Sequence, residues 1–317
     1  MSESRPGTTL LSVPGKTFLV GEYLAIAGGP SLLLSTGPRF ELRYWNSGST
    51  RDRRQPFAPA SPAGHLLARH RERQREAASS LRFDFTDPHR GKGGLGASSA
   101  QFALVYAALE NWSSFDAANV DWKRLLEDYR ACAWNGEGSA PSGADVVSQL
   151  CGDVTWYDGR EFRTRSFEWK FPTLGFTLLR TGAKLATHEH LRQSGTTSEA
   201  KAALHESLRT AVLQATNSFE TRNESQLVAS VDQAAKALAL AGLTAERTQT
   251  LLSELRSRDG LIVAAKGCGA MGADVMLLIH ERSRTREIES CAREMELEIC
   301  GSTDSLSQGL KIEPSVG

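Results

Sequence analysis

The stretch Gly91-Lys92-Gly93-Gly94-Leu95-Gly96-Ala97-Ser98-Ser99-Ala100 runs directly into the apolar segment Phe102–Leu109. Its glycines permit tight turns that aim successive backbone amides at one point. The apolar segment is typical of a helix, whose first turn adds free N–H groups and the positive end of the helix dipole. The sequence therefore predicts a loop that holds phosphate.

Two better known phosphate loops fit this sequence less well. A Walker loop requires a glycine five residues before its Gly-Lys-Thr run, and Leu10 holds that place before Gly15-Lys16-Thr17. The dinucleotide pattern G-x-G-x-x-G should open a regular alternation of strands and helices, whereas its first copy here follows a charged, irregular region. That pattern occurs twice, at Gly91, Gly93 and Gly96 and again at Gly267, Gly269 and Gly272.

Two further segments combine small residues with charge. Near the N-terminus, Ser12–Lys16 places a lysine beside a Pro-Gly turn and before a strand, and Gly21-Glu22-Tyr23 follows. Near the other end, Lys266–Asp274 separates the apolar runs 261–265 and 275–279, as in a β-hairpin. Taken singly, the lysine could be a solvated surface residue and the glycine loop an ordinary hairpin turn.

In this order, the three segments resemble the three motifs of the GHMP kinases, the superfamily of galactokinase, homoserine kinase, mevalonate kinase and phosphomevalonate kinase. The resemblance spans nearly the whole chain. It is most similar to phosphomevalonate kinase at Gly21-Glu22-Tyr23, Lys266, the segment 181–187 and the closing Gly309–Ile312. The resemblance implies an α+β, two-domain GHMP kinase fold with the active site in the interdomain cleft. The ATP-binding domain is expected over residues 1–165 and a ferredoxin-like C-terminal domain over residues 166–317.

The resemblance also implies the site residues. Lys16 and Asp145 are expected to be catalytic, because Pro141–Asp145 has the Pro-Ser-Gly-x-Asp pattern of mevalonate-type kinases. From the residues alone, Asp145 could instead be an ordinary first-turn acid that interacts with a helix dipole. ATP is expected on Gly94, Leu95, Gly96, Ala97, Ser98 and Ser99, and Mg²⁺ on Ser98 and Glu137. Substrate contacts are expected from Glu22, Tyr23, Ser142, Gly143, Lys184, Thr187, Lys266, Gly269 and Ala270, with Arg180 as a further cation.

The chain departs from the family pattern in several places. Ala97 stands where serine is commoner, and Met271 and Ala273 stand where glycine is usual. Trp134 occupies the position of a metal-binding glutamate in mevalonate kinases, and Glu137 lies near but out of register. These departures leave open a non-catalytic GHMP-fold protein that binds a ligand. The presence of Lys16, Ser98 and Asp145 favours an enzyme.

The expected reaction is the ATP-dependent phosphorylation of mevalonate 5-phosphate to the diphosphate, in the mevalonate pathway of isoprenoid biosynthesis. A phosphate monoester, with a second pKa of about 6, is already an anion at neutral pH, so Asp145 would orient Lys16 and take no proton. The alternatives are mevalonate kinase, a sugar or homoserine kinase, and the related decarboxylase. With an alcohol as acceptor, Asp145 would serve as the base.

Composition agrees with these expectations. The chain has 317 residues, 40% of them hydrophobic, and no formal net charge, so it has no overall attraction to nucleic acid or an anionic membrane. Its five cysteines form no CxxC pair, which favours a reducing compartment. With no signal-like N-terminus and no apolar run of membrane length, the expected location is the cytoplasm. A monomer or homodimer with a small-molecule partner is expected, without nucleic acid or membrane.

Two further segments could suggest a nucleic-acid site or a zinc site, but their residue patterns do not support either. The arginine-rich residues 47–80 are interrupted by Glu72 and Glu76, which favours a loop and a solvated helix over 64–78 rather than a nucleic-acid site. His188-Glu189-His190 has no second ligand pair to make a zinc site. The remaining pattern predicts strands at 31–34, 40–45, 81–85, 153–157, 175–180 and 297–300 and helices at 99–112, 122–133, 142–150, 198–216, 225–241, 245–258 and 284–296.

Overall fold

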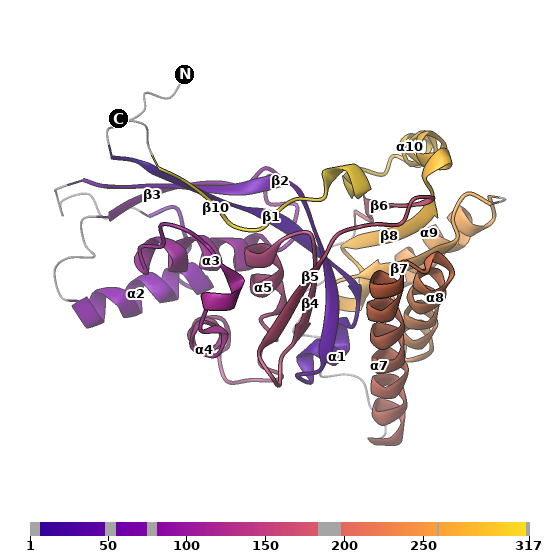
Figure 1. Ribbon diagram of the computed structural model, residues 1–317, viewed down its shortest axis with the longest axis horizontal. Coiled ribbons are helices and arrows are strands. Elements are labelled where there is room, and N and C mark those ends of the chain that lie inside the picture. The colour runs from indigo at the N-terminus through magenta and orange to yellow at the C-terminus, as the bar shows by residue number, and fades with distance from the viewer. Residues whose placement is uncertain (1–6, 48–54, 75–80, 183–197, 259, 315–317) are drawn as a thin grey trace.

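A computed structural model describes residues 7–47, 55–74, 81–182, 198–258 and 260–314 of the chain. Its strands form two antiparallel sheets (Figure 1). The first sheet contains β1 (Thr9–Val20), β2 (Pro30–Asn46), β3 (Leu81–Thr86), β4 (Val154–Asp158), β5 (Arg163–Phe167) and β10 (Lys311–Pro314), in the order β10-β1-β2-β4-β5, with β3 also paired to β2. The second contains β6 (Leu174–Arg180), β7 (Ala264–Cys268), β8 (Val275–Glu281) and β9 (Ile299–Ser302), in the order β7-β8-β6-β9.

The helices fall into two groups along the chain: one lies among the strands of the first sheet and the other among the strands of the second (Figure 1). The first group is α1 (Glu22–Ile26), α2 (Pro62–Gln74), α3 (Ala97–Leu109), α4 (Trp122–Ala133) and α5 (Ala144–Cys151). The second group is α7 (Ser198–Thr221), α8 (Glu224–Leu240), α9 (Glu246–Arg256) and α10 (Thr285–Glu294). No helix within the described ranges is long and apolar enough to cross a membrane.

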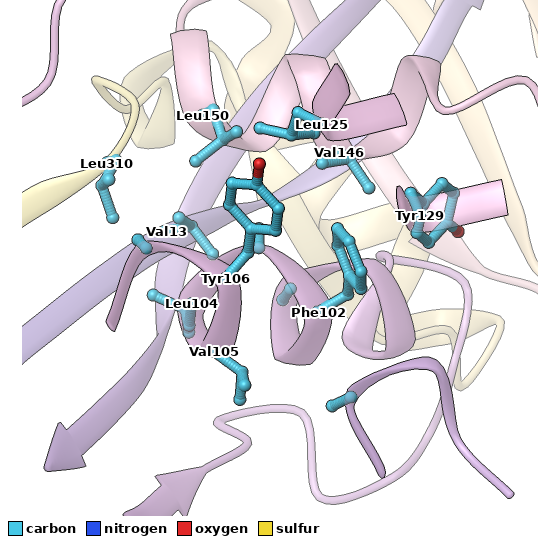
Figure 2. Close-up of a cluster of buried hydrophobic side chains, with 14 of the residues drawn as sticks. Val13, Phe102, Leu104, Val105, Tyr106, Leu125, Tyr129, Val146, Leu150 and Leu310 are labelled. Carbon is cyan, nitrogen blue, oxygen red and sulfur yellow. The ribbon is translucent and has the colours of Figure 1, made fainter. Parts of the chain in front are cut away.

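Helix α3 lies at the centre of the first core. Every residue from Phe102 to Ala108 is buried, so the helix is covered on all sides and not along one stripe. Figure 2 shows Phe102 and Tyr106 of α3 facing Leu125 and Tyr129 of α4, with Val146 of α5 beside them. Because packed interiors hold their side chains in fixed positions, the N-terminal end of α3, where the glycine loop enters, is held rigidly.

The second sheet confirms the predicted ferredoxin-like unit. The chain runs β6, helices, β7, β8, α10, β9, and the sheet order places the first strand β6 between β8 and β9. This is the split β-α-β-β-α-β arrangement, with α7, α8 and α9 together filling the first helical connection. The two sheets share a core, because Leu19 and Leu34 of the first sheet cluster with Leu178 and Leu277 of the second.

The structure corrects two details of the expected strands. The expected strands at 31–34 and 40–45 are one strand, β2, which stays paired with β1 across a bulge where residues 37–39 of β2 lie opposite Pro14 of β1. The last strand, β10, pairs with β1, so residues 311–314 lie in the first sheet although the expected division placed 166–317 together. The division near residue 165 otherwise stays a prediction.

The other expected elements are present, most of them with shifted ends, and the sequence analysis did not predict α1, β5 or β10. The His188-Glu189-His190 cluster lies outside the described residues. Among those that are described, no three His, Cys, Asp or Glu side chains gather as metal ligands.

Candidate active site

The glycine loop has the backbone conformation that its sequence predicts. Gly93, Gly94 and Gly96 have φ values of 79°, 81° and 83°, in the left-handed region that favours glycine. A Cβ on Gly96 would lie 2.9 Å from the Ser99 Oγ and 3.0 Å from the Lys16 Cγ, so neighbouring groups also exclude a side chain there. Gly96 is the N-cap of α3, and no side chain caps that helix.

Three carbonyl groups of the glycine loop accept hydrogen bonds from residues outside the loop. The Gly93 carbonyl accepts a hydrogen bond from Nη1 of Arg180. The Leu95 carbonyl accepts one from the Lys16 N–H at 3.0 Å, and the Gly96 carbonyl accepts one from Nε2 of Gln149 at 3.0 Å. In a trans peptide the carbonyl and the following N–H point in opposite directions. The N–H groups that follow these three carbonyls therefore point away from the residues that hold the loop.

These loop amides are free to bind a ligand. Across the part of the chain that the structure describes, no backbone N–H from Gly94 through Ser99 donates a hydrogen bond. Unsatisfied N–H groups at a helix N-terminus, together with the helix dipole, attract anions. The segment 94–99 that the sequence predicts to bind ATP thus presents the donors that phosphate oxygens require.

Lys16 supplies a cation beside this loop. It lies on β1, packs its Cγ against Gly96, and carries its Nζ 5.2 Å from the centre of the Phe18 ring. Its side chain forms no ion pair with any described residue. A half-buried ammonium without an acidic partner is available to a phosphate group.

Asp145 lies in the first turn of α5, as the second residue after the N-cap residue Gly143. The Tyr129 hydroxyl donates to its Oδ2 at 3.4 Å. Burial and then the nearby Asp145 raise the pKa of Tyr129 well above its ordinary value, so the phenol stays protonated and remains a donor. The carboxylate is therefore held by a buried hydroxyl at the helix end.

Gln149 links α5 to the Pro14-Gly15 step of β1 and to the glycine loop, and the sequence analysis missed this residue. Its Nε2 donates to the carbonyls of Pro14 at 3.2 Å and Gly96 at 3.0 Å. Residues four apart share a helix face, so Asp145 lies one turn along α5 from this contact. The spacing from Asp145 was the one signal in the sequence that could have indicated Gln149.

The two residues that were expected to bind Mg²⁺, Ser98 and Glu137, both lie at the surface. Ser98 is exposed on the first turn of α3, whereas the Ser99 hydroxyl is buried and donates to the Gly96 carbonyl at 2.9 Å. Glu137 is exposed in a turn where its carbonyl accepts from Nε1 of Trp134 at 2.8 Å. Metal binding by Ser98 and Glu137 stays a prediction.

Glu22 and Lys266 form a buried ion pair. Glu22 lies on α1, which follows β1 of the first sheet, and Lys266 lies on β7 of the second sheet. Their Oε1 and Nζ atoms are 2.6 Å apart, and the residues are 6% and 1% exposed. Burial lowers the pKa of Lys266, but Cys268 and Glu22 raise it by more, so the net pKa lies above its ordinary value. The structure thus joins two residues that were expected to bind substrate, and each is the other's partner.

The third glycine loop packs against the other two segments. The Tyr23 hydroxyl accepts a hydrogen bond from the Met271 N–H at 3.1 Å. Met271 has a φ of 54°, the left-handed conformation that explains why glycine is usual there. A Cβ on Gly94 would lie 3.0 Å from the Asp274 Cβ, so this loop also borders the glycine loop at Gly91–Gly96.

The remaining expected residues have these positions. Gly269 and Ala270 lie in the third loop. The Ser142 hydroxyl accepts a hydrogen bond from the Ala144 N–H at 3.3 Å, at the start of α5. Lys184 and Thr187 lie outside the described residues. All three motifs therefore converge around Gly94–Ser99, and substrate binding by these residues stays a prediction.

No protein-family model matches this sequence, and no curated protein matches it. Solved structures do. The chain is similar to the Lin0012 protein of Listeria innocua, with a TM-score of 0.75, 15% identity and coverage of 98% of this chain and 100% of that one. It is similar to phosphomevalonate kinase of Streptococcus pneumoniae in complex with phosphomevalonate and AMPPNP, with a TM-score of 0.72, 17% identity and coverage of 92% and 98%. It is also similar to Lactococcus lactis galactokinase complexed with galactose, with a TM-score of 0.73, 10% identity and coverage of 96% and 95%.

The chain has the GHMP kinase fold, as the three motifs predicted. Within that fold, its neighbours include a kinase bound to a phosphate ester and a kinase bound to a sugar. The shared fold therefore spans both kinds of acceptor, and the acceptor of this chain has to be argued from its own residues.

Proposed function

We propose that this protein is an ATP-dependent small-molecule kinase. The observation that carries the proposal is the row of unbonded amides from Gly94 through Ser99 at the start of α3, with Lys16 packed against Gly96. Phosphoryl transfer requires that a protein position the phosphates and neutralise their charge, and these groups do both. The likeness of the fold to kinases supports the same reading.

In the proposed mechanism, the loop amides bind the nonbridging oxygens of the ATP phosphates. Lys16 offsets the charge that develops on the transferred group. Mg²⁺ would reduce the charge of the phosphates, and an exposed hydroxyl such as that of Ser98 is an oxygen ligand of the kind that Mg²⁺ accepts. Asp145, held by Tyr129, would face the acceptor and orient Lys16 once the phosphates are bound.

For the acceptor, we propose mevalonate 5-phosphate, which becomes the diphosphate. The support is the Gly21-Glu22-Tyr23 sequence and the likeness of the fold to a phosphomevalonate kinase. Since Lys266 is paired with Glu22, and Arg180 is buried and donates to the Gly93 carbonyl, the expected cation that remains for an anionic acceptor is Lys184. Mevalonate, a sugar and homoserine are the alternative acceptors, and with these Asp145 would accept the hydroxyl proton.

We further propose that the enzyme works in the cytoplasm, as a monomer or homodimer, in isoprenoid biosynthesis by the mevalonate pathway. A non-catalytic GHMP-fold binding protein is the second candidate. It would not need this set of charged and hydroxyl groups, so the presence of Lys16, Ser98 and Asp145 favours the enzyme.

A coupled assay of ADP release tests the proposal. The enzyme is supplied with Mg²⁺, ATP and, in separate reactions, mevalonate 5-phosphate, mevalonate, homoserine and galactose. We expect turnover with mevalonate 5-phosphate and loss of turnover in Lys16→Met, with Lys123→Met, an exposed lysine on α4, as the matched control. Turnover only with an unphosphorylated acceptor would reject the acceptor but keep the kinase. Absence of both ADP release and Mg-AMPPNP binding by calorimetry would reject the kinase.

A further inference from the structure

Arg180 is a buried cation of the second sheet that reaches the phosphate loop. It is the last residue of β6 and is 7% exposed. Its Nη1 donates to the Gly93 carbonyl, and its Nε lies 3.5 Å from Oε1 of Glu298. A buried guanidinium is costly unless it is paired, so its position behind this loop needs a reason.

The contact with Gly93 fixes the direction of one loop amide. Because the peptide that joins Gly93 to Gly94 is planar, holding the Gly93 carbonyl toward Arg180 turns the Gly94 N–H the other way, among the unbonded donors. Gly94 itself has no side chain and a φ of 81°, so its own backbone does not fix this orientation. Arg180 supplies the constraint that the glycine lacks.

A second link joins the same loop to the same strand end. Lys92, the residue before Gly93, forms an ion pair with Oε2 of Glu298 at 2.6 Å. Glu298 also accepts a backbone hydrogen bond from Arg180 at 2.9 Å. The Lys92–Glu298 pair is largely exposed and is expected to contribute little by itself. The buried guanidinium is therefore the stronger of the two links between the ferredoxin-like unit and the loop.

We propose that Arg180 is a positioning residue for the phosphate chain of the nucleotide. This inference rests on the proposed kinase function. It goes beyond that function because it makes the ferredoxin-like unit part of the nucleotide-binding site. Arg180 itself contacts no ligand. It acts through the Gly94 N–H, which donates to a phosphate oxygen. The Arg180 guanidinium lies on the carbonyl side of the same peptide.

Calorimetry with Mg-AMPPNP tests this role, with adenosine as a second ligand that has no phosphates. Arg180→Met should weaken Mg-AMPPNP binding by about tenfold or more, since a hydrogen bond to a charged group would lose its alignment. Adenosine affinity should stay at the wild-type value. Arg180→Lys should recover part of the loss, because an ammonium can still donate to the Gly93 carbonyl.

Arg247 is the matched control, because its Nε donates to the carbonyl of Thr181, the residue after Arg180, at 2.7 Å and does not touch the loop. Arg247→Met should bind both ligands as the wild type does. If Arg180→Met does not fold in a thermal melt, Arg180→Gln takes its place, with the same expected loss of Mg-AMPPNP affinity.

Two results would overturn the inference. One is wild-type Mg-AMPPNP affinity in a folded Arg180→Met or Arg180→Gln variant. The other is an equal loss of Mg-AMPPNP and adenosine affinity, which would mean a general disturbance of the fold. Failure of the wild type itself to bind Mg-AMPPNP is a different outcome, because it rejects the kinase proposal before Arg180 is tested.

Discussion

Replacement of Lys266 by methionine should be among the most destabilising single changes in this protein. The variant leaves the Glu22 carboxylate, 6% exposed, without the ammonium that lies 2.6 Å from it. Breaking a buried ion pair by removing one partner costs about 3–5 kcal/mol, because the remaining charge stays buried and uncompensated. Free energies of unfolding from urea titrations of the wild type and Lys266→Met measure this cost.

The double variant Glu22→Leu with Lys266→Met separates the cost of a lone charge from the value of the pair. Apolar side chains of similar volume often replace a buried pair at little cost. The double variant should therefore be much more stable than the sum of the two single losses indicates. The net pKa of Lys266 lies above its ordinary value, so the stabilisation is present at neutral pH and is lost only as alkaline pH passes the folded-state pKa.

Lys236 and Asp232 on α8 provide the control. Their Nζ and Oδ2 atoms are also 2.6 Å apart, but the side chains are 72% and 36% exposed. Lys236→Met should cost no more than about 0.5 kcal/mol, as is usual for an exposed pair within a helix. If Lys266→Met cost as little as Lys236→Met, or if the Glu22 and Lys266 changes were simply additive, the reasoning from burial would be wrong.

Three further predictions concern the site and the response to pH. Ser98→Ala should lower turnover and shift its dependence on Mg²⁺ in a titration of initial rates, and an unchanged Mg²⁺ curve would remove Ser98 from the metal site. Lys16→Met and Asp145→Asn should each lower kcat by orders of magnitude with little change in thermal midpoint, and near-normal turnover would give that residue a structural role. Burial lowers the pKa of His280, so the stability that its neutral form gives is complete above about pH 6.5 and falls as pH decreases toward the folded-state pKa. Thermal melts across this range should show that loss in the wild type and less of it in His280→Gln, and equal slopes would contradict the prediction.

Local patterns predicted the fold well because glycine turns and apolar periods depend on near neighbours in the sequence. The loop at Gly91–Gly96, the hairpin around Lys266–Asp274 and the order of strands and helices along the ferredoxin-like unit all follow from such signals. By contrast, β10 finds its partner β1 at the other end of the chain. Its four residues give no periodicity to recognise.

The placement of Lys266 could not be predicted in the same way. Beside a glycine loop, a lysine is a reasonable ligand for an anionic substrate, and the sequence shows no difference between that role and a buried one. The difference lies in Glu22, which is 244 residues away in the chain. Only the packing of α1 against β7 decides that the two charges meet.

The glycine loop at Gly91–Gly96 depends on both local sequence and distant packing. Its glycines specify a backbone that can turn, but they do not decide which way each peptide faces. That is decided from behind, by the Lys16 N–H on β1, Gln149 on α5 and Arg180 on β6. These three groups come from separate parts of the chain and from both sheets. The loop sequence therefore marks where phosphate is expected to bind, and the complete fold supplies the orientation that makes its amides available.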